Sequence, residues 1–417
     1  MGLKRRDVLR SMALLGAASA FGGARAEDGD SIFGVFERNR ILRDTDRDGN
    51  TAAAMQAIDT IEPVLSYDTA YNLQTAIALY ERIVAAGGWE QMPREVFGLV
   101  LGNDRNGVIA LKNRLMMSGD LAPATRVNGM FDEELDAAVR RFQARHGIVI
   151  SGKIDEPTFF AINATADYRL NQLRLNAQRV DQLAGKFSDR YVVVNIPAAT
   201  IEAVEAGTVA QRHTAVVGRI DRQTPILSSR IHQINFNPYW HVPKSIIQRD
   251  LIKYMNDDPE YLTKYRIHIY DGNGQELMPT QIDWTTDEAV QYTFRQEPGG
   301  ENSMGHVKIN FHNPHSVYLH DTPSKALFAE NARFHSSGCV RVEGVNSLVA
   351  WILQENGGWD VPIVDALFAT NERMDVAVNS PVPIHTTYIS AWANRLGTVS
   401  FRDDVYQFDA ESRVTFA

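Results

Sequence analysis

Apolar residues recur with a helical period through most of the first 190 residues. The pattern predicts an amphipathic helix that begins at Tyr67 and ends at Gly87-Gly88, because paired glycines terminate helices. Three later helices are predicted over Asp132–Gly147, Glu156–Asn163 and Tyr168–Ala184, and a further one around residues 108–116. The first half of the chain is therefore expected to be helical.

The pattern changes to short β segments after residue 189. Strands are predicted at Tyr191–Asn195, within Thr214–Val217 and within Ile231–Phe236, with Gly and Pro between them. Alternation over residues 316–321 predicts another strand with His320 near its C-terminal end. Two more strands are expected at Thr398–Phe401 and Val405–Phe408. The fold class is α+β, with several domains and a mainly-β second half.

A long excursion separates Val242 from His306. It contains a helical piece over Ser245–Asn256 and polar turns such as Asp271–Gly274. A tract of this length just before a strand that carries chemistry is typical of a lid. The alternative is a subdomain without a role in catalysis.

Composition narrows the class of protein. The chain has 417 residues, 44% hydrophobic and 22% charged, which allows two or three soluble domains. The net charge of -9 argues against nucleic acid as a partner.

The first 26 residues have the layout of an export signal. Lys4–Arg10 is basic and contains Arg5-Arg6, an apolar run covers Met12–Phe21, and Ala24-Arg25-Ala26 ends the segment. The paired arginines resemble a twin-arginine signal, although an ordinary secretory signal is the alternative. The apolar run is too short to span a bilayer comfortably, so we expect a soluble exported protein.

Asp44–Asn50 has the alternating carboxylates and glycine of half a calcium loop. Met55 occupies the position where a bidentate glutamate would be needed, so a solvated turn is the preferred interpretation.

Cys339 is the single cysteine of the chain and cannot form an internal disulfide. A lone cysteine is commonly a small buried hydrophobe, but Ser336-Ser337-Gly338 and Arg341 are poor core neighbours. Helical spacing resumes at Val345, so Cys339 is expected on a loop that leads into a helix N-terminus. The helix dipole and a nearby imidazole would then lower the pKa of the thiol from about 8.5 toward neutrality. The amides of Gly338 and Cys339 could face a developing oxyanion.

The pattern His320…Ser336-Ser337-Gly338-Cys339-Val340-Arg341 resembles the active-site signature of L,D-transpeptidases with a YkuD-type catalytic domain. The resemblance implies that Cys339 is the nucleophile, that His320 is the general base, and that Gly338 and Cys339 supply oxyanion-hole amides. It also implies that Ser336 and Arg341 lie at substrate-contacting positions and that the backbone carbonyl of Asp321 completes the triad. Ser337 departs from the histidine that many members carry, which points to the large Gram-negative branch.

A second resemblance covers residues 104–166, where Asp132…Phe142…His146-Gly147…Gly152…Thr158 is similar to a three-helix peptidoglycan-binding domain. The expected domains are an export signal (1–26), a helical scaffold (27–103), the peptidoglycan-binding domain (104–166), a scaffold return helix (167–188) and the catalytic domain (189–417). The lid would cover about 242–306, and Trp240 and Tyr318 are expected to line the substrate groove.

The function implied by resemblance is 3→3 crosslinking of meso-diaminopimelate residues in peptidoglycan through a cysteine acyl-enzyme. The partners would be a tetrapeptide donor stem and a diaminopimelate acceptor in the periplasm, and carbapenems would acylate Cys339. No cofactor is expected. The histidines at 232, 241, 268, 306, 312, 315 and 335 lack metal-ligand spacing, so no metal is expected either. The alternatives are an L,D-carboxypeptidase, a protein-anchoring enzyme of the same chemistry, and a non-catalytic wall-binding protein.

Overall fold

The computed structural model describes residues 54, 58, 60–183 and 187–415. The predicted export signal and the Asp44–Asn50 loop lie outside the described residues. No helix within the described ranges is long and apolar enough to cross a membrane.

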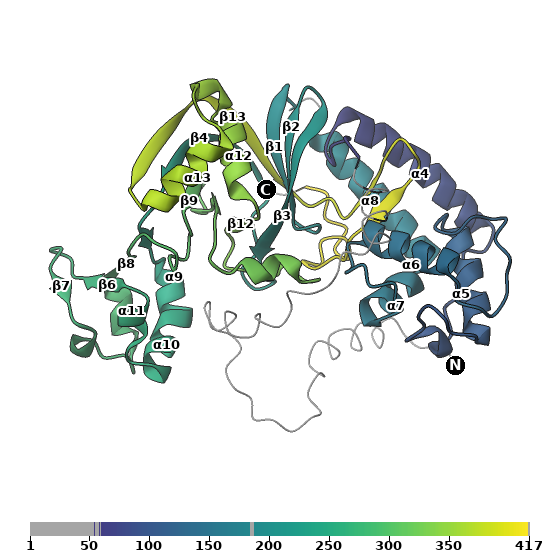
Figure 1. The fold of residues 1–417 in the computed structure, drawn as a ribbon, viewed down its shortest axis with the longest axis horizontal. Coiled ribbons are helices and arrows are strands. Elements are labelled where there is room, and N and C mark those ends of the chain that lie inside the picture. The colour runs from purple at the N-terminus through teal and green to yellow at the C-terminus, as the bar shows by residue number, and fades with distance from the viewer. Residues whose placement is uncertain (1–53, 55–57, 59, 184–186, 416–417) are drawn as a thin grey trace. The chain divides into compact units, whose positions relative to one another are not determined.

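Two long helices pack together in the helical part (Figure 1). Helix α4 covers Tyr67–Ala85 and helix α8 covers Ala166–Leu183, close to the predicted ranges. Ser66 caps α4, because its side chain accepts a hydrogen bond from the Thr69 N–H. The apolar faces of both helices share a core with β14 (Ala391–Ala393) and β15 (Val399–Phe401) from the C-terminal region.

Three shorter helices form a compact unit with its own core. They are α5 (Asn106–Met117), α6 (Glu133–His146) and α7 (Glu156–Asn163), preceded by a 3-10 turn at Arg94–Val96. The side chains of Asp132 and Asp155 cap α6 and α7. Fully buried residues at the centre of this unit include Leu111, Leu115, Phe131 and Phe142.

A nine-stranded sheet dominates the second half of the chain. Its order is β11-β3-β12-β10-β9-β4-β13-β1-β2, and β2 also pairs with β3, so the sheet closes on itself. The strands are β1 (Arg190–Asn195), β2 (Thr200–Glu205), β3 (Thr208–Gly218), β4 (Leu227–Phe236), β9 (Val307–Phe311), β10 (Leu319–His320), β11 (Phe334–Ser336), β12 (Val340–Val342) and β13 (Met374–Thr387). Helix α12 (Val345–Ile352) and helix α13 (Val361–Thr370) add apolar side chains to the same core.

The excursion between β4 and β9 forms a small layer of its own, here called the insert (residues 237–306). Its four strands have the order β5-β8-β6-β7 and cover Trp240–His241, Thr293–Gln296, Ile267–Tyr270 and Glu276–Leu277. A helical run follows β5, with α9 (Lys244–Ile246), a π-helical turn (Ile247–Leu251), α10 (Ile252–Asp257) and then α11 (Tyr261–Lys264). The Asn237 N–H donates to the His306 carbonyl at 2.7 Å, so the chain enters and leaves the insert at one point.

Two strand predictions need correction. Val405–Phe408 forms turns, and the predicted strand over 316–321 is reduced to Leu319–His320. Tyr406 and Phe408 are buried against Tyr388, so their apolar character reflects core packing without a strand.

Candidate active site

Three neighbouring strands place Lys308, His320 and Arg341 in one row. His320 of β10 lies opposite Lys308 of β9 and opposite Arg341 of β12. Residues two apart on a strand face the same side, and the Val340 N–H donates to the Tyr318 carbonyl just beyond β10. Tyr318 and Cys339 therefore continue the row toward one end of these strands.

Cys339 lies between β11 and β12, and its side chain is partly exposed. The helix expected from Val345 is present as α12, but the short strand β12 separates it from Cys339, so the cysteine is not at the helix N-terminus. The expected lowering of the pKa of Cys339 is wrong. Burial raises the pKa of the thiol, and this outweighs the hydrogen bonds from Tyr318 and the charges of Lys308 and Arg341 that act in the opposite direction.

His320 is buried and oriented by the backbone of its neighbour. Its Nδ1 lies 2.5 Å from the Asp321 carbonyl oxygen. If Nδ1 carries the proton and donates it to this carbonyl, Nε2 has a free lone pair. Burial, then the charge of Arg341, lowers the pKa of His320 to about 3, so the imidazole is neutral at physiological pH.

Asp321 contributes its carbonyl to this arrangement, while its carboxylate is engaged elsewhere. The carboxylate accepts the His306 N–H at 3.0 Å and pairs with Lys325.

The loop that carries Cys339 is held by its own hydrogen bonds. Ser336 Oγ donates to the Cys339 carbonyl at 2.5 Å and accepts the Gly338 N–H at 3.1 Å. Gly338 has φ of 114°, a region that favours glycine. Ser336 is buried and directs both bonds into the loop, so it shapes the loop in this structure. The Gly338 amide is occupied by this bond, whereas the Cys339 N–H has no hydrogen-bond partner within residues 60–183 and 187–415.

Residues far away in sequence support the loop from behind. Thr224 Oγ1 donates to the Gly338 carbonyl at 2.9 Å and accepts the Gly218 N–H at 2.9 Å. Tyr406 Oη donates to the Gly218 carbonyl at 2.6 Å and accepts the Thr224 N–H at 3.2 Å. Sequence reasoning missed this role of Tyr406, because no local pattern links the C-terminal turn to residue 338.

The insert contacts the same loop through Arg222. The Arg222 guanidinium forms two hydrogen bonds with the Asp250 carboxylate, at 2.6 and 3.0 Å, and one with Ser337 Oγ at 3.0 Å. Asp250 belongs to the π-helical turn of the insert. The exposed Ser337 is therefore tied to the insert through one arginine.

Trp240 and Tyr318 lie together at the site. Trp240, in β5 of the insert, acts on the Tyr318 phenol. Burial and then Cys339 raise the pKa of Tyr318, and Trp240 acts in the opposite direction. The Tyr318 ring centre is 5.6 Å from that of His320 and 4.3 Å from Lys308 Nζ. The structure thus brings both predicted aromatics next to the cysteine and histidine.

Two cations of the row lack a carboxylate partner. Arg341 is buried, and burial lowers its pKa to about 10 despite attraction by Cys339. Burial also lowers the pKa of Lys308, against attraction by Cys339 and Asp375. Neither forms an ion pair with another residue that the structure describes. The arrangement suits a thiolate or an incoming carboxylate, because uncompensated buried cations attract anions.

Lys308 was not predicted from the sequence. Residues 307–311 alternate like any half-buried strand, and only the register of β9 against β10 places Lys308 beside His320. No cluster of three or more His, Cys, Asp or Glu residues suited to a metal occurs in the described part of the chain.

Comparisons with known proteins identify two domains. Residues 189–384 match the YkuD family, described as the L,D-transpeptidase catalytic domain, and residues 104–162 match a family described as "Putative peptidoglycan binding domain". A protein of Haemophilus influenzae named "Putative L,D-transpeptidase" is 31% identical over 241 residues, which cover 58% of this chain and 48% of that protein. The chain thus spans about half the length of this curated relative.

Solved structures of L,D-transpeptidases are also similar to the chain. One, from Xylanimonas cellulosilytica, is 13% identical, with 70% of this chain and 98% of that chain covered and a TM-score of 0.23. Another, LdtMt1 in complex with imipenem, is 15% identical, with 48% and 59% covered and a TM-score of 0.24.

Proposed function

We propose that this chain forms 3→3 crosslinks between meso-diaminopimelate residues of peptidoglycan, because residues 189–384 match the YkuD family, described as the L,D-transpeptidase catalytic domain. The observation that carries the proposal is the row Lys308–His320–Arg341 beside Cys339, with a neutral imidazole oriented by the Asp321 carbonyl. A nucleophile next to a base that a third group orients is the arrangement that covalent acyl transfer needs.

The resting pair is uncharged. The thiol has a raised pKa and the imidazole a lowered one, so a preformed thiolate–imidazolium pair is disfavoured. His320 Nε2 takes the thiol proton as Sγ attacks the carbonyl between the third and fourth stem residues. Lys308 and Arg341 stabilise the negative charge that develops on sulfur.

Acylation releases D-alanine. The tetrahedral intermediate places its oxyanion toward the Cys339 N–H, and its collapse breaks the C–N bond while the imidazolium protonates the leaving amine. The side-chain amine of a second diaminopimelate then attacks the thioester and passes its proton to His320. Collapse of this second intermediate forms the new amide and restores the protonated thiol.

The surrounding parts fit this role. The insert, joined to the cysteine loop through Arg222, acts as a lid that excludes water and so favours the amine over hydrolysis. The domain at 104–162 holds the enzyme on the wall, which implies export to the cell envelope, and in a Gram-negative cell to the periplasm. The substrates are a tetrapeptide donor and a diaminopimelate acceptor, and a carbapenem such as imipenem acylates Cys339.

The test is mass spectrometry of products formed from disaccharide-tetrapeptide by the full chain and by Cys339→Ala. Crosslinked dimers that disappear in the variant support the proposal. Tripeptide without dimers would make the enzyme a carboxypeptidase, and transfer to a protein lysine would make it an anchoring enzyme. If no product forms while both proteins bind sacculi, the chain is a binding protein. An imipenem adduct on the wild type and none on the variant checks the nucleophile separately.

A further inference from the structure

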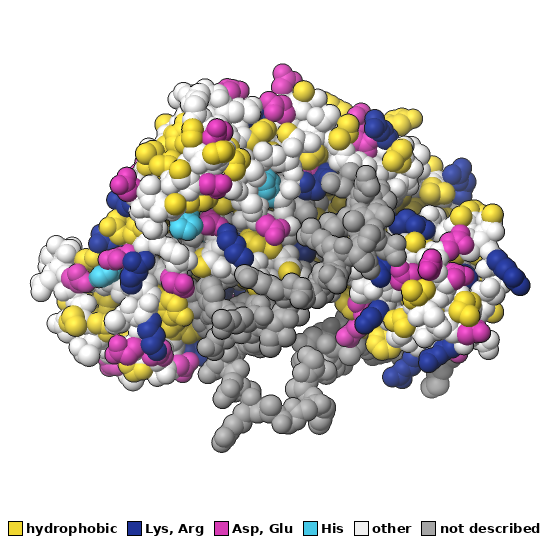
Figure 2. Space-filling model, in the orientation of Figure 1, with side chains coloured by type: hydrophobic (Ala, Val, Ile, Leu, Met, Phe, Trp, Pro, Cys, Tyr) yellow, Lys and Arg dark blue, Asp and Glu magenta, His cyan; other side chains and the backbone are white. Residues whose placement is uncertain are grey.

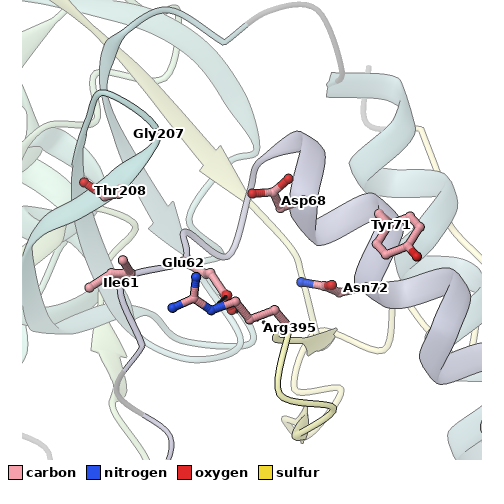
Figure 3. Close-up of a pocket in the computed structure, with 8 residues that line it drawn as sticks. All are labelled: Ile61, Glu62, Asp68, Tyr71, Asn72, Gly207, Thr208 and Arg395. Carbon is pink, nitrogen blue, oxygen red and sulfur yellow. Dashed lines mark hydrogen bonds and ion pairs between the residues drawn. The ribbon is translucent and has the colours of Figure 1, made fainter.

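A pocket of about 330 Å³ lies away from the cysteine, between the helical part and the closed sheet. Four separate segments supply its walls (Figure 3): residues 61–62, the start of α4, the turn between β2 and β3, and the turn between β14 and β15. Hydrogen bonds hold these segments together. The Val209 N–H donates to the Ile61 carbonyl at 2.8 Å, and the Arg395 N–H donates to Glu62 at 3.1 Å. The volume lies at the lower end of the range for small-molecule sites.

One polar side chain of the pocket, that of Asn72, presents an amide that solvent can reach. Asn72 is 8% exposed, and its amide points toward Glu62 and Arg395 in Figure 3. It forms no side-chain hydrogen bond with any residue in the described ranges. The amide atoms are not fully enclosed by protein, so they are available to a ligand in the pocket. Its neighbour one turn earlier, Asp68, lines the pocket without an ion pair in the same ranges.

The charges and apolar surfaces indicate a class of ligand. Glu62 pairs with Arg395 at 3.0 Å, which leaves Asp68 as the uncompensated charge and disfavours anions such as stem-peptide carboxylates. An amide and a carboxylate together bind hydroxyl and acetamido groups. Tyr71 and Ile61, 75% and 54% exposed, offer apolar surface against which the face of a sugar ring can pack. We propose that this pocket binds an N-acetylhexosamine of a glycan strand.

Distance decides which sugar can occupy the pocket. The pocket includes Thr208, the first residue of β3, whereas Gly218 at the other end of β3 contacts Thr224 behind the cysteine loop. Ten residues of strand span about 33 Å. A four-residue stem reaches at most about 14 Å, so the sugar that carries the reacting stem cannot reach the pocket. The occupant is a more remote sugar of the same strand or one of a neighbouring strand. This inference rests on peptidoglycan as the substrate.

The test uses hydrogen–deuterium exchange of the full chain carrying Cys339→Ala, with the N-acetylglucosamine tetrasaccharide as the probe. We expect slower exchange in peptides that cover 60–73, 205–210 and 393–398. Asn72→Leu and Asp68→Ala, the second at an exposed position, should each raise the sugar concentration needed for half-maximal protection about ten-fold. Glu81→Ala, on the same helix but outside the pocket, is the matched control.

Several outcomes would overturn the proposal: no protection, protection restricted to 104–162, or protection that Asn72→Leu leaves unchanged. Protection by a lysine tripeptide but not by the sugar would mean an amine site and would overturn it as well. A melting curve shows whether Asn72→Leu folds. If it does not fold, the loss of protection in Asp68→Ala tests the pocket instead. Because the Cys339→Ala background does not turn over, failure here is separate from failure of the crosslinking assay.

Discussion

Two buried cations of the three-helix unit have carboxylate partners, whereas the two cations of the catalytic row have none among the described residues. In the three-helix unit Lys112 is fully buried and lies 2.6 Å from Asp132, and Arg145 forms two 2.6 Å hydrogen bonds with Asp120. Arg114 is an exception in the three-helix unit: it has no ion pair with a described residue, burial lowers its pKa to about 10, and its guanidinium carbon lies 3.7 Å from the Trp89 ring centre. At the catalytic site, neither Lys308 nor Arg341 forms an ion pair with a carboxylate of a described residue.

Arg145 and Arg341 illustrate the difference between a cation paired within the fold and one that faces the cysteine. Burial works against the charge of Arg145, yet Asp120 outweighs it and its pKa is raised. At Arg341 nothing outweighs burial and the pKa falls to about 10. An unpaired buried cation contributes little to the stability of the protein, and its interaction energy becomes most favourable when an anion binds beside it.

Breaking the buried pair of the three-helix unit should have the largest effect on stability. Asp120→Ala leaves Arg145 buried beside Arg114 and Arg169, and we expect it to lower the free energy of unfolding by about 3–5 kcal/mol. Chemical denaturation measures this. The control is Glu81→Ala, which removes an exposed pair with Arg174 and should cost less than about 1 kcal/mol. Equal losses in the two variants would contradict the comparison.

Arg341→Met should change stability little and slow the reaction strongly. Removing an unpaired buried cation is expected to change the free energy of unfolding by less than about 1 kcal/mol, while imipenem acylation slows by about 100-fold, or about 2.7 kcal/mol in activation free energy. Mass spectrometry over time follows the adduct. Arg341→Lys, which keeps the charge, should recover part of the rate. A stability loss as large as that of Asp120→Ala would make Arg341 a structural cation.

The neutral imidazole of His320 predicts a dependence of stability on pH. Its pKa is about 3 when folded and about 6.5 when unfolded, so the unfolded chain binds a proton that the folded one does not. Stability from this group is therefore complete above pH about 6.5 and is lost as the pH falls toward 3. As the pH falls from 6 to 4, the free energy of unfolding of His320→Gln should rise by about 1.4 kcal/mol per pH unit relative to that of the wild type. Unfolding curves at several pH values measure the difference, and a constant difference would refute the neutral imidazole.

Tyr406→Phe should slow acylation much less than Arg341→Met does. The loss of its bonds to Gly218 and Thr224 is expected to cost about 1–2 kcal/mol and to slow acylation several-fold, because Thr224 supports the Gly338 carbonyl. Tyr67→Phe, with an exposed ring, is the control. Unchanged acylation in Tyr406→Phe would show that the loop keeps its geometry without this support.

Helix ends that depend on neighbouring residues could be predicted from the sequence. Helix α7 occupies the predicted residues, since Asp155 caps its start, and α6 ends at His146 because Gly147 adopts φ of 68°. The cysteine and the histidine could be named because the residues around them match a family motif, and the Asp321 carbonyl was inferred from the same resemblance. Lys308 could not, since its role depends on strand register, nor could the pKa directions, which depend on burial.

The point at which the chain enters and leaves the insert has a consequence for modularity. Phe236 at the end of β4 lies opposite Val307 at the start of β9, so these strands are already an antiparallel pair. Topologically, residues 237–306 are an enlarged hairpin loop. A short turn in their place would leave every pairing of the closed sheet intact. The pairing of the closed sheet therefore permits the insert to be lengthened or exchanged as a unit, and such a change would alter both access to Cys339 and the contacts that the insert makes with Ser337 through Arg222.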